Sequence, residues 1–187
     1  MHAEQLWGRE LVLELVPQRP PLLMVDRVLR WNGDGRASLT ASKQIDLSEP
    51  ALAGHFPGQP VWPGVLTVEG LAQTCRMLGT LERLAAERSR AEVMARLDNL
   101  ERWLRGISGV DEPSARETRS QLSSMNGPGL LVAIDLRWTR PVFPGGRLDY
   151  HATLQRRMDS LVRFDVEACV LGETVARGAL TTARQEA

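Results

Sequence analysis

The most constraining feature of the sequence is a long apolar stretch that begins at Pro63. Proline suits the first position of a helix, and the next proline is Pro113. Gly70 and Gly79 weaken a helix here without ending it. The residues that cover most of its circumference are apolar, namely Val65, Leu66, Val68, Leu71, Ala72, Cys75, Leu78 and Leu81. A helix that is apolar nearly all round must be buried, so the rest of the chain has to surround it.

The same helix carries a single polar stripe. Glu69, Gln73 and Arg76 recur at i, i+4 and i+7 and therefore share one face. A carboxylate on a core helix is costly unless it has a partner or a use.

The segments on either side of this helix predict short strands. The expected elements, in order, are a helix at 5–16, strands at 22–31 and 36–45 joined by a turn at 32–35, a turn-rich segment at 46–63, the long helix, an amphipathic helix at 81–105 broken near Ser89, a long loop at 106–128, and strands at about 130–142, 147–158, 161–171 and 174–184. One long helix wrapped by a meandering antiparallel sheet is an α+β arrangement. We expect residues 1–187 to form a single domain.

Composition excludes several classes of function. The 23 basic and 23 acidic residues balance, so no global positive field attracts nucleic acid or an anionic membrane. Cys75 and Cys169 offer neither a disulfide framework nor a metal-ligand spacing. The chain has no pattern of a signal peptide or of a membrane span. We therefore expect a cytoplasmic protein without a metal, a nucleic-acid partner or a membrane partner.

Residues 54–75 read GHFPGQPVWPGVLTVEGLAQTC and place His55 and Glu69 in apolar company. This motif resembles the signature of the 3-hydroxyacyl-[acyl-carrier-protein] dehydratases of the FabZ-like family. The segments LELVPQRPPLLMVDRVL (13–29) and RWTRPVFPGGRLDYHATL (137–154) resemble other parts of the same family.

The resemblance implies a hot-dog fold, in which a curled antiparallel sheet wraps the long helix. It implies a homodimer, with His55 of one protomer facing Glu69 of the other, and in many members a trimer of dimers. The expected reaction converts a (3R)-3-hydroxyacyl chain, carried on the phosphopantetheine of an acyl carrier protein, to the trans-2-enoyl product. No metal or diffusible cofactor is implied.

The residue types suit that chemistry. An imidazole that titrates near neutrality can remove the α-proton, which gives His55 the role of base. A carboxyl in an apolar pocket can stay protonated and donate to the departing hydroxyl, which gives Glu69 the role of acid. The backbone N–H of Gly64, at the start of the helix, can bind the thioester oxygen. The further candidate substrate-binding residues are Phe56, Val65, Trp62 and Gln73.

Plainer interpretations of these residues remain open. His55 can be an ordinary core histidine, Glu69 can be paired with Arg76, and Gln73 can support Glu69 rather than touch substrate. Phe56 and Trp62 can be packing residues, and Gly64 a simple helix start. Cys75 is expected in the core rather than as a nucleophile. Arg137 and Arg140 are candidates for contact with the pantetheine phosphate or an acidic carrier helix, or are ordinary surface charges.

Two other functions compete with dehydration. One is a hot-dog acyl thioesterase, and the other is a non-catalytic subunit of a heteromeric dehydratase. The related dehydratase/isomerases have aspartate at the acid position, so Glu69 predicts dehydration without isomerisation. Fatty acid synthesis and a specialised polyketide or polyene pathway are both compatible with the sequence.

Residues 82–128 depart from the family pattern and form an expected insertion. The following strand also begins without the tyrosine that gates the tunnel in relatives. The insertion can cover the tunnel mouth, dock a carrier protein or block a higher oligomer, and the alternative is a solvated pair of decorative helices.

Overall fold

The computed structural model describes residues 6–33, 35–127 and 129–184. Six strands form one sheet in the order β1-β2-β4-β5-β6-β3, and each neighbouring pair is antiparallel. The strands are β1 (Arg27–Asn32), β2 (Ser38–Gln44), β3 (Gly129–Trp138), β4 (Arg147–Met158), β5 (Leu161–Val170) and β6 (Glu173–Arg184). The sheet is open, with β1 and β3 at its two edges.

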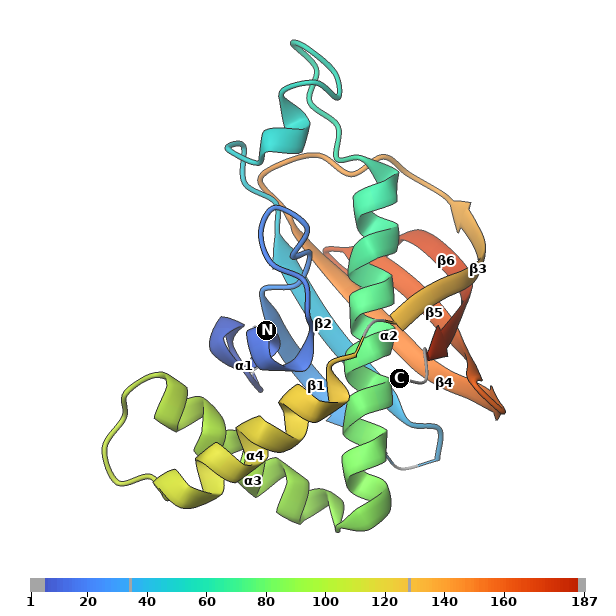
Figure 1. Cartoon of the computed structure of the whole chain (residues 1–187). Coiled ribbons are helices and arrows are strands. Elements are labelled where there is room, and N and C mark those ends of the chain that lie inside the picture. The colour runs from blue at the N-terminus through green and yellow to red at the C-terminus, as the bar shows by residue number, and fades with distance from the viewer. Residues whose placement is uncertain (1–5, 34, 128, 185–187) are drawn as a thin grey trace.

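The long helix α2 (Gly64–Glu87) lies across one face of this sheet, against β2, β4 and β5 (Figure 1). Its side chains Leu71, Cys75, Leu78 and Leu81 are fully buried. The predicted core helix, and the α+β hot-dog arrangement built around it, are therefore confirmed. The helix begins after Pro63, whose fixed φ suits the approach to a first turn.

The predicted break near Ser89 is also confirmed. The α2 helix ends at Glu87, and the hydroxyl of Ser89 accepts a hydrogen bond from the backbone N–H of Glu92 at 3.2 Å. This cap satisfies one of the first-turn donors of the next helix, α3 (Arg90–Leu104).

The prediction of a long loop at 106–128 was wrong, because most of that segment is helix α4 (Glu112–Met125). Asp111 caps it by accepting from Ser114 N at 3.1 Å. Its buried residues are Ala115, Thr118 and Leu122, spaced i, i+3 and i+7. Two of these are small or polar, so the helical stripe carries almost no hydrophobic signal in the sequence.

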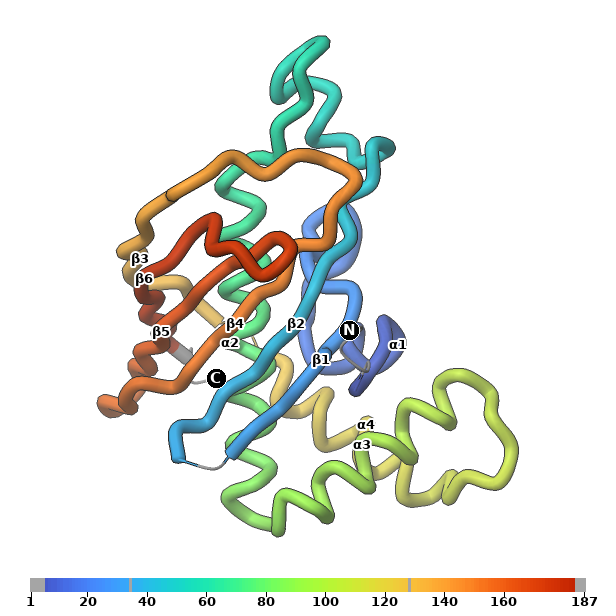
Figure 2. Tube along the Cα trace, turned by 180° about the vertical axis from the view of Figure 1, so that it is seen from behind, coloured from blue at the N-terminus to red at the C-terminus, as the bar shows by residue number. Residues whose placement is uncertain are grey.

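Helices α3 and α4 form a hairpin that packs on the N-terminal helix α1 (Arg9–Leu15). Arg119 on α4 forms an ion pair with Glu14 at 3.0 Å, and Trp7 Nε1 donates to Asp98 on α3 at 2.7 Å. Buried side chains of the hairpin join the hydrophobic core, including Val93, Leu97, Leu100 and Leu122. The hairpin is therefore part of the core rather than a solvated decoration. It lies at the C-terminal end of α2, at the opposite end from the 53–62 loop (Figures 1 and 2).

The N-terminal part of the chain matches its prediction with shifted boundaries. The strand expected at 22–31 begins only at Arg27, because residues 20–26 carry the two prolines and turn before entering the sheet. β1 and β2 pair as the expected hairpin, and residue 34 of its turn lies outside the described residues.

The strand β3 does not pair with β4, the next strand along the chain. It lies beside β6, so the sheet is not a simple meander. All its residues except Leu136 are exposed. No helix within 6–33, 35–127 and 129–184 is long and apolar enough to cross a membrane.

Candidate active site

A tight loop presents His55 at the N-terminal end of α2. It follows the short helix η1 (Pro50–Leu52), and the backbone N–H of Val61 donates to the His55 carbonyl at 2.8 Å to close it. The ring atom Nδ1 lies 2.8 Å from the carbonyl oxygen of Val61. Because a carbonyl oxygen only accepts, Nδ1 must carry the hydrogen, and the neutral ring then has its lone pair on Nε2. His55 is thus held as the tautomer that a base requires.

Polar contacts anchor both ends of the loop, one to the connection between β3 and β4 and the other to β2. The Trp62 N–H donates to the carbonyl of Val142 at 2.8 Å, and its indole is only 3 % exposed. Glu49, which precedes η1, accepts from Lys43 on β2 at 2.6 Å. Lys43 is itself 5 % exposed, so this ion pair is sheltered from water. Trp62 therefore packs inside the protomer, where it supports the loop.

Gly64 opens α2 against an indole. A Cβ at Gly64 would lie 3.1 Å from ring atoms of Trp138, the last residue of β3. The amide of a first-turn residue has no acceptor within its own helix, so the N–H of Gly64 is available to a ligand. Its neighbour Val65 is 74 % exposed, and Phe56 beside His55 is 57 % exposed. In one chain, the start of α2 is therefore an open apolar surface.

Glu69 lies one turn further along α2 and is held by two side-chain amides. Gln73 Nε2 donates to Glu69 Oε1 at 2.8 Å, and Gln18 Nε2 donates to the same oxygen at 3.1 Å. Gln73 is 1 % exposed and also accepts from Met24 N at 2.9 Å and donates to the carbonyl of Leu22 at 2.7 Å. The carboxyl is thus fixed through one oxygen, and its other oxygen, Oε2, makes no hydrogen bond within the described residues.

His55 and Glu69 do not meet within one chain. Among the described residues, no hydrogen bond or ion pair joins them. The exposed apolar side chains of β3 lie at the adjacent sheet edge, namely Leu130, Leu131, Val132, Ile134 and Trp138. No group of three or more His, Cys, Asp or Glu side chains in the described part of the chain could hold a metal ion.

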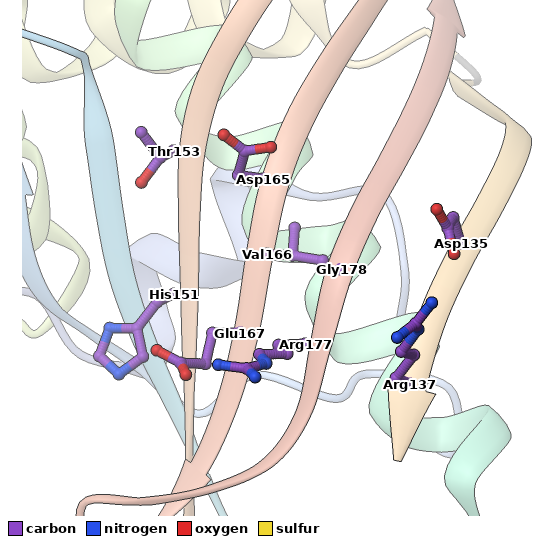
Figure 3. A pocket seen from close by; sticks show the side chains of 9 residues that line it. All are labelled: Asp135, Arg137, His151, Thr153, Asp165, Val166, Glu167, Arg177 and Gly178. Carbon is purple, nitrogen blue, oxygen red and sulfur yellow. The ribbon is translucent and has the colours of Figure 1, made fainter. Parts of the chain in front are cut away.

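A separate hollow of the protomer lies on the face of the sheet that turns away from α2 (Figure 3). It encloses about 590 Å³ and contains none of the motif residues. Its floor is a cross-strand row of His151, Glu167, Arg177 and Arg137. Glu167 lies between His151 and Arg177 along this row, and Arg177 is the direct cross-strand partner of Arg137. Most of the side chains that line the hollow are polar or charged, unlike the largely apolar lining of a typical ligand pocket.

Comparison with known proteins identifies the family. Residues 16–103 match the model of a FabA-like domain. The chain is 34% identical to the 3-hydroxyacyl-[acyl-carrier-protein] dehydratase FabZ of Anaeromyxobacter sp. (strain Fw109-5), over 89% of this chain and 83% of that protein. It is 33% identical to the FabZ of Polynucleobacter necessarius subsp. necessarius (strain STIR1), over 92% and 89% of the two chains. The chain belongs to the FabZ family.

Solved structures agree with this FabZ fold. The dehydratase heterocomplex ApeI:P from Xenorhabdus doucetiae superposes with a TM-score of 0.60 at 15% identity, covering 94% of this chain and 91% of that one. A homologue of HP0420 from Helicobacter felis gives a TM-score of 0.52 at 10% identity, covering 96% and 89%. The family and the hot-dog fold expected from the motif are both confirmed.

Several other side chains of this FabZ-family chain occupy structural places. Cys75 is fully buried, and burial raises the pKa of its thiol far above the usual value, so it is no nucleophile. Arg140 forms an ion pair with Glu173, and Arg137 lines the hollow on the outer face. His151 on that face lies 3.1 Å from the hydroxyl of Thr40.

Two residues at the site were not among the sequence candidates. Gln18 contacts Glu69 from a segment that precedes the sheet, and Trp138 covers Gly64 from the far end of β3. Both lie in the segments that resemble the family, 13–29 and 137–154, but a glutamine or a tryptophan alone does not indicate a role in the site. Only the folded chain brings them to α2.

Proposed function

We propose that this protein dehydrates (3R)-3-hydroxyacyl chains on an acyl carrier protein to trans-2-enoyl chains, with His55 as base and Glu69 as acid. Membership of the FabZ family supports the reaction class. The observation that carries the residue assignment is a shared geometry: His55 and Glu69 are each fixed through one polar atom, and each retains a second one for the substrate.

The proposed reaction has balanced proton movements. Nε2 of His55 takes the proton from C2, while the N–H of Gly64 binds the thioester oxygen, on which negative charge develops. Glu69 then donates the proton on Oε2 to the C3 hydroxyl, which leaves as water as the C2–C3 double bond forms. A proton passed from the imidazolium back to the carboxylate, by way of water, restores both groups.

The site needs a second copy of the chain. The outer edge of an edge strand such as β3 presents backbone donors and acceptors that the sheet does not use, and the Leu130, Val132 and Ile134 side chains of β3 are each more than half exposed. Antiparallel pairing of β3 with its copy would satisfy this edge and cover the apolar surface. In the resulting homodimer, His55 of one protomer would face Glu69 of the other, as the motif implies. A trimer of such dimers and a cytoplasmic location remain predictions.

Substrate would lie along the open start of α2. Phe56, Val65 and the indole of Trp138 supply apolar contact there, whereas Trp62 and Gln73 are buried and support the loop and the carboxyl from behind. The acyl carrier protein would deliver the chain to this surface without a metal or diffusible cofactor. Fatty acid synthesis is the setting that the relatives indicate, and a polyketide or polyene pathway is the alternative.

The test is the hydration of trans-2-enoyl pantetheine thioesters, followed as loss of the conjugated-enoyl absorbance. We expect His55→Ala and Glu69→Gln each to lower kcat by about 10²- to 10⁴-fold. The matched controls are His151→Ala and Glu167→Gln, the same changes on the outer face of the sheet, and these should retain activity. Equal losses in the controls, or an active Glu69→Gln, would refute the assignment.

Two further readouts separate the competing functions. Release of free thiol would indicate a thioesterase, and substantial trans-2 to cis-3 isomerisation would contradict the role inferred from glutamate at position 69. A protein that never turns over alone, but does so with a second hot-dog protein, would be the subunit of a heteromeric dehydratase.

A further inference from the structure

The carboxyl of Glu69 has an unequal environment at its two oxygens. Oε1 accepts from both Gln73 and Gln18, at 2.8 and 3.1 Å. A carboxylic oxygen has two lone pairs, so two N–H donors leave Oε1 no lone pair for a proton. A protonated Glu69 therefore carries its hydrogen on Oε2.

The two amides differ in how firmly they are oriented. The Gln73 amide accepts from Met24 N through its oxygen and donates to the Leu22 carbonyl through its nitrogen, so rotating it by a half-turn would break both bonds. Its N–H is a fixed donor to Glu69. The Gln18 amide has no such anchors, and its nitrogen bonds only to Glu69.

The oxygen of Gln18 is left in an unfavourable place. Oε1 of Gln18 is buried and has no hydrogen-bond partner among the residues that the structure describes. A buried acceptor without a partner costs free energy, and such groups call for an explanation. When Glu69 is ionised, the opposite orientation would point this oxygen at Oε1 of Glu69, where two acceptors would repel. The Gln18 side chain therefore donates to Glu69 at the expense of a hydrogen bond to its own amide oxygen.

The backbone around Gln18 holds the amide in reach. Arg19 Nη1 donates to the carbonyls of Val16 and Gln18 at 2.9 and 2.8 Å, which braces the turn before Pro20. On the other side of Gln18, the ring of Pro17 fixes the φ angle of residue 17. Placement of the amide is therefore built into the segment and does not depend on a flexible loop.

We propose that Gln18 is a positioning residue for the acid: as the second donor to Oε1, it confines the transferable proton of Glu69 to Oε2, the oxygen that faces the substrate. This inference rests on the proposed function of Glu69. It assigns to Gln18 a role in proton delivery, distinct from contact with the acyl chain. Since Gln18 and Gln73 are both neutral, they orient the carboxyl without locking it as an anion. Tyr150 is a titratable group that interacts electrostatically with Glu69. Burial raises the pKa of Tyr150 far above the pH range of the assay.

The test compares Gln18→Met with wild type across pH in the dehydration direction, with 3-hydroxyacyl pantetheine thioesters, followed as gain of the conjugated-enoyl absorbance. Methionine keeps the length and flexibility of the side chain but has no N–H. With one donor lost, Oε1 can also hold the proton, so we expect kcat to fall about tenfold with little change in KM.

The chain offers a closely matched control. Gln155 Nε2 donates to a carboxylate oxygen of Asp165 at the same distance, 3.1 Å, on the exposed face of the sheet. Gln155→Met should leave kcat and the pH profile unchanged. Gln18→His, which keeps an N–H donor, should recover most of the lost activity, and Gln18→Met should add no further loss to Glu69→Gln.

Two results would overturn the proposal. One is an unchanged kcat in Gln18→Met. The other is an equal loss at every pH with a lowered thermal midpoint and no rescue by histidine, which would make Gln18 a purely structural residue. An active Glu69→Gln would instead refute the proposed function itself, so the two failures are distinguishable.

Discussion

Gly70 and Gly79 occupy the same helix, but the same substitution should affect them in opposite directions. A Cβ at Gly70 would lie 2.2 Å from Cζ, 2.4 Å from the hydroxyl oxygen and 2.7 Å from Cε2 of Tyr150, which is fully buried. A Cβ at Gly79 would meet no atom within 4 Å. Both positions gain about 1 kcal/mol of helix propensity when glycine becomes alanine.

The packing around Gly70 decides the sign there. Two ring atoms and the hydroxyl oxygen would have to move by about an ångström in a filled core, which places the cost at about 3 kcal/mol, the upper end for overpacking. Subtracting the propensity gain leaves Gly70→Ala less stable by about 2 kcal/mol. Gly79→Ala has no such cost and should be more stable by about 0.5–1 kcal/mol.

Thermal unfolding followed by far-UV circular dichroism measures both variants. For a chain of this size, about 2–4 °C accompanies each kcal/mol, so Gly70→Ala should lower Tm by about 4–8 °C, and Gly79→Ala should raise it slightly. Protein concentration must be held constant, because self-association into the proposed homodimer would add its own stabilisation. The double variant Gly70→Ala with Tyr150→Leu should be less destabilised than the two single changes added together. If Gly70→Ala raises Tm as Gly79→Ala does, the ring of Tyr150 does not lie against α2.

Three further predictions concern other buried groups. Lys43→Met removes one partner of the sheltered ion pair with Glu49, so the free energy of unfolding, measured by urea denaturation, should fall by about 3–5 kcal/mol. The double variant Lys43→Met with Glu49→Gln should recover part of that loss. Burial raises the pKa of Glu101, against the opposing effect of the hydrogen bond from the Gly8 N–H. Wild type should therefore lose stability relative to Glu101→Gln as pH rises above about 4.5, and the stabilities of the two proteins should converge below that pH. Convergence at high pH instead would contradict that sign. Cys75 should resist a thiol reagent at pH 8 until the protein is unfolded, and rapid labelling in the native state would show that α2 opens.

The parts of the fold that the sequence predicts well depend on local signals. The long apolar run after Pro63 could only be a buried helix, and the hydroxyl of Ser89 marked its end. Such signals lie within a few residues of the element that they define. The long motif around His55 likewise identified the family without any knowledge of contacts.

The failures come from information that is not local. The buried face of helix α4 is not recognisable in the sequence, because Ala115 and Thr118 contribute little hydrophobicity. That face becomes buried only when α4 packs against α3. The pairing of β3 with β6 depends on the whole sheet, since each strand alone would pair equally well with another. Gln18 reaches Glu69 across 51 positions of sequence, and no spacing rule connects them. That residues 82–128 are an insertion relative to other family members remains a prediction. The helices of this segment nevertheless contribute side chains to the hydrophobic core.

The sheltered position of Lys43 has a practical consequence. It is the single lysine of the chain, and it lies within β2 at 5 % exposure. A protease that cleaves only after lysine can therefore cut at one peptide bond, and only when β2 separates from its neighbours. Digestion would give two fragments whose rate of appearance reports the opening of the sheet. Lysine-directed cross-linkers, in turn, would find no reactive side chain on the folded surface, so contacts with the proposed carrier protein would have to be mapped through carboxylate or arginine chemistry.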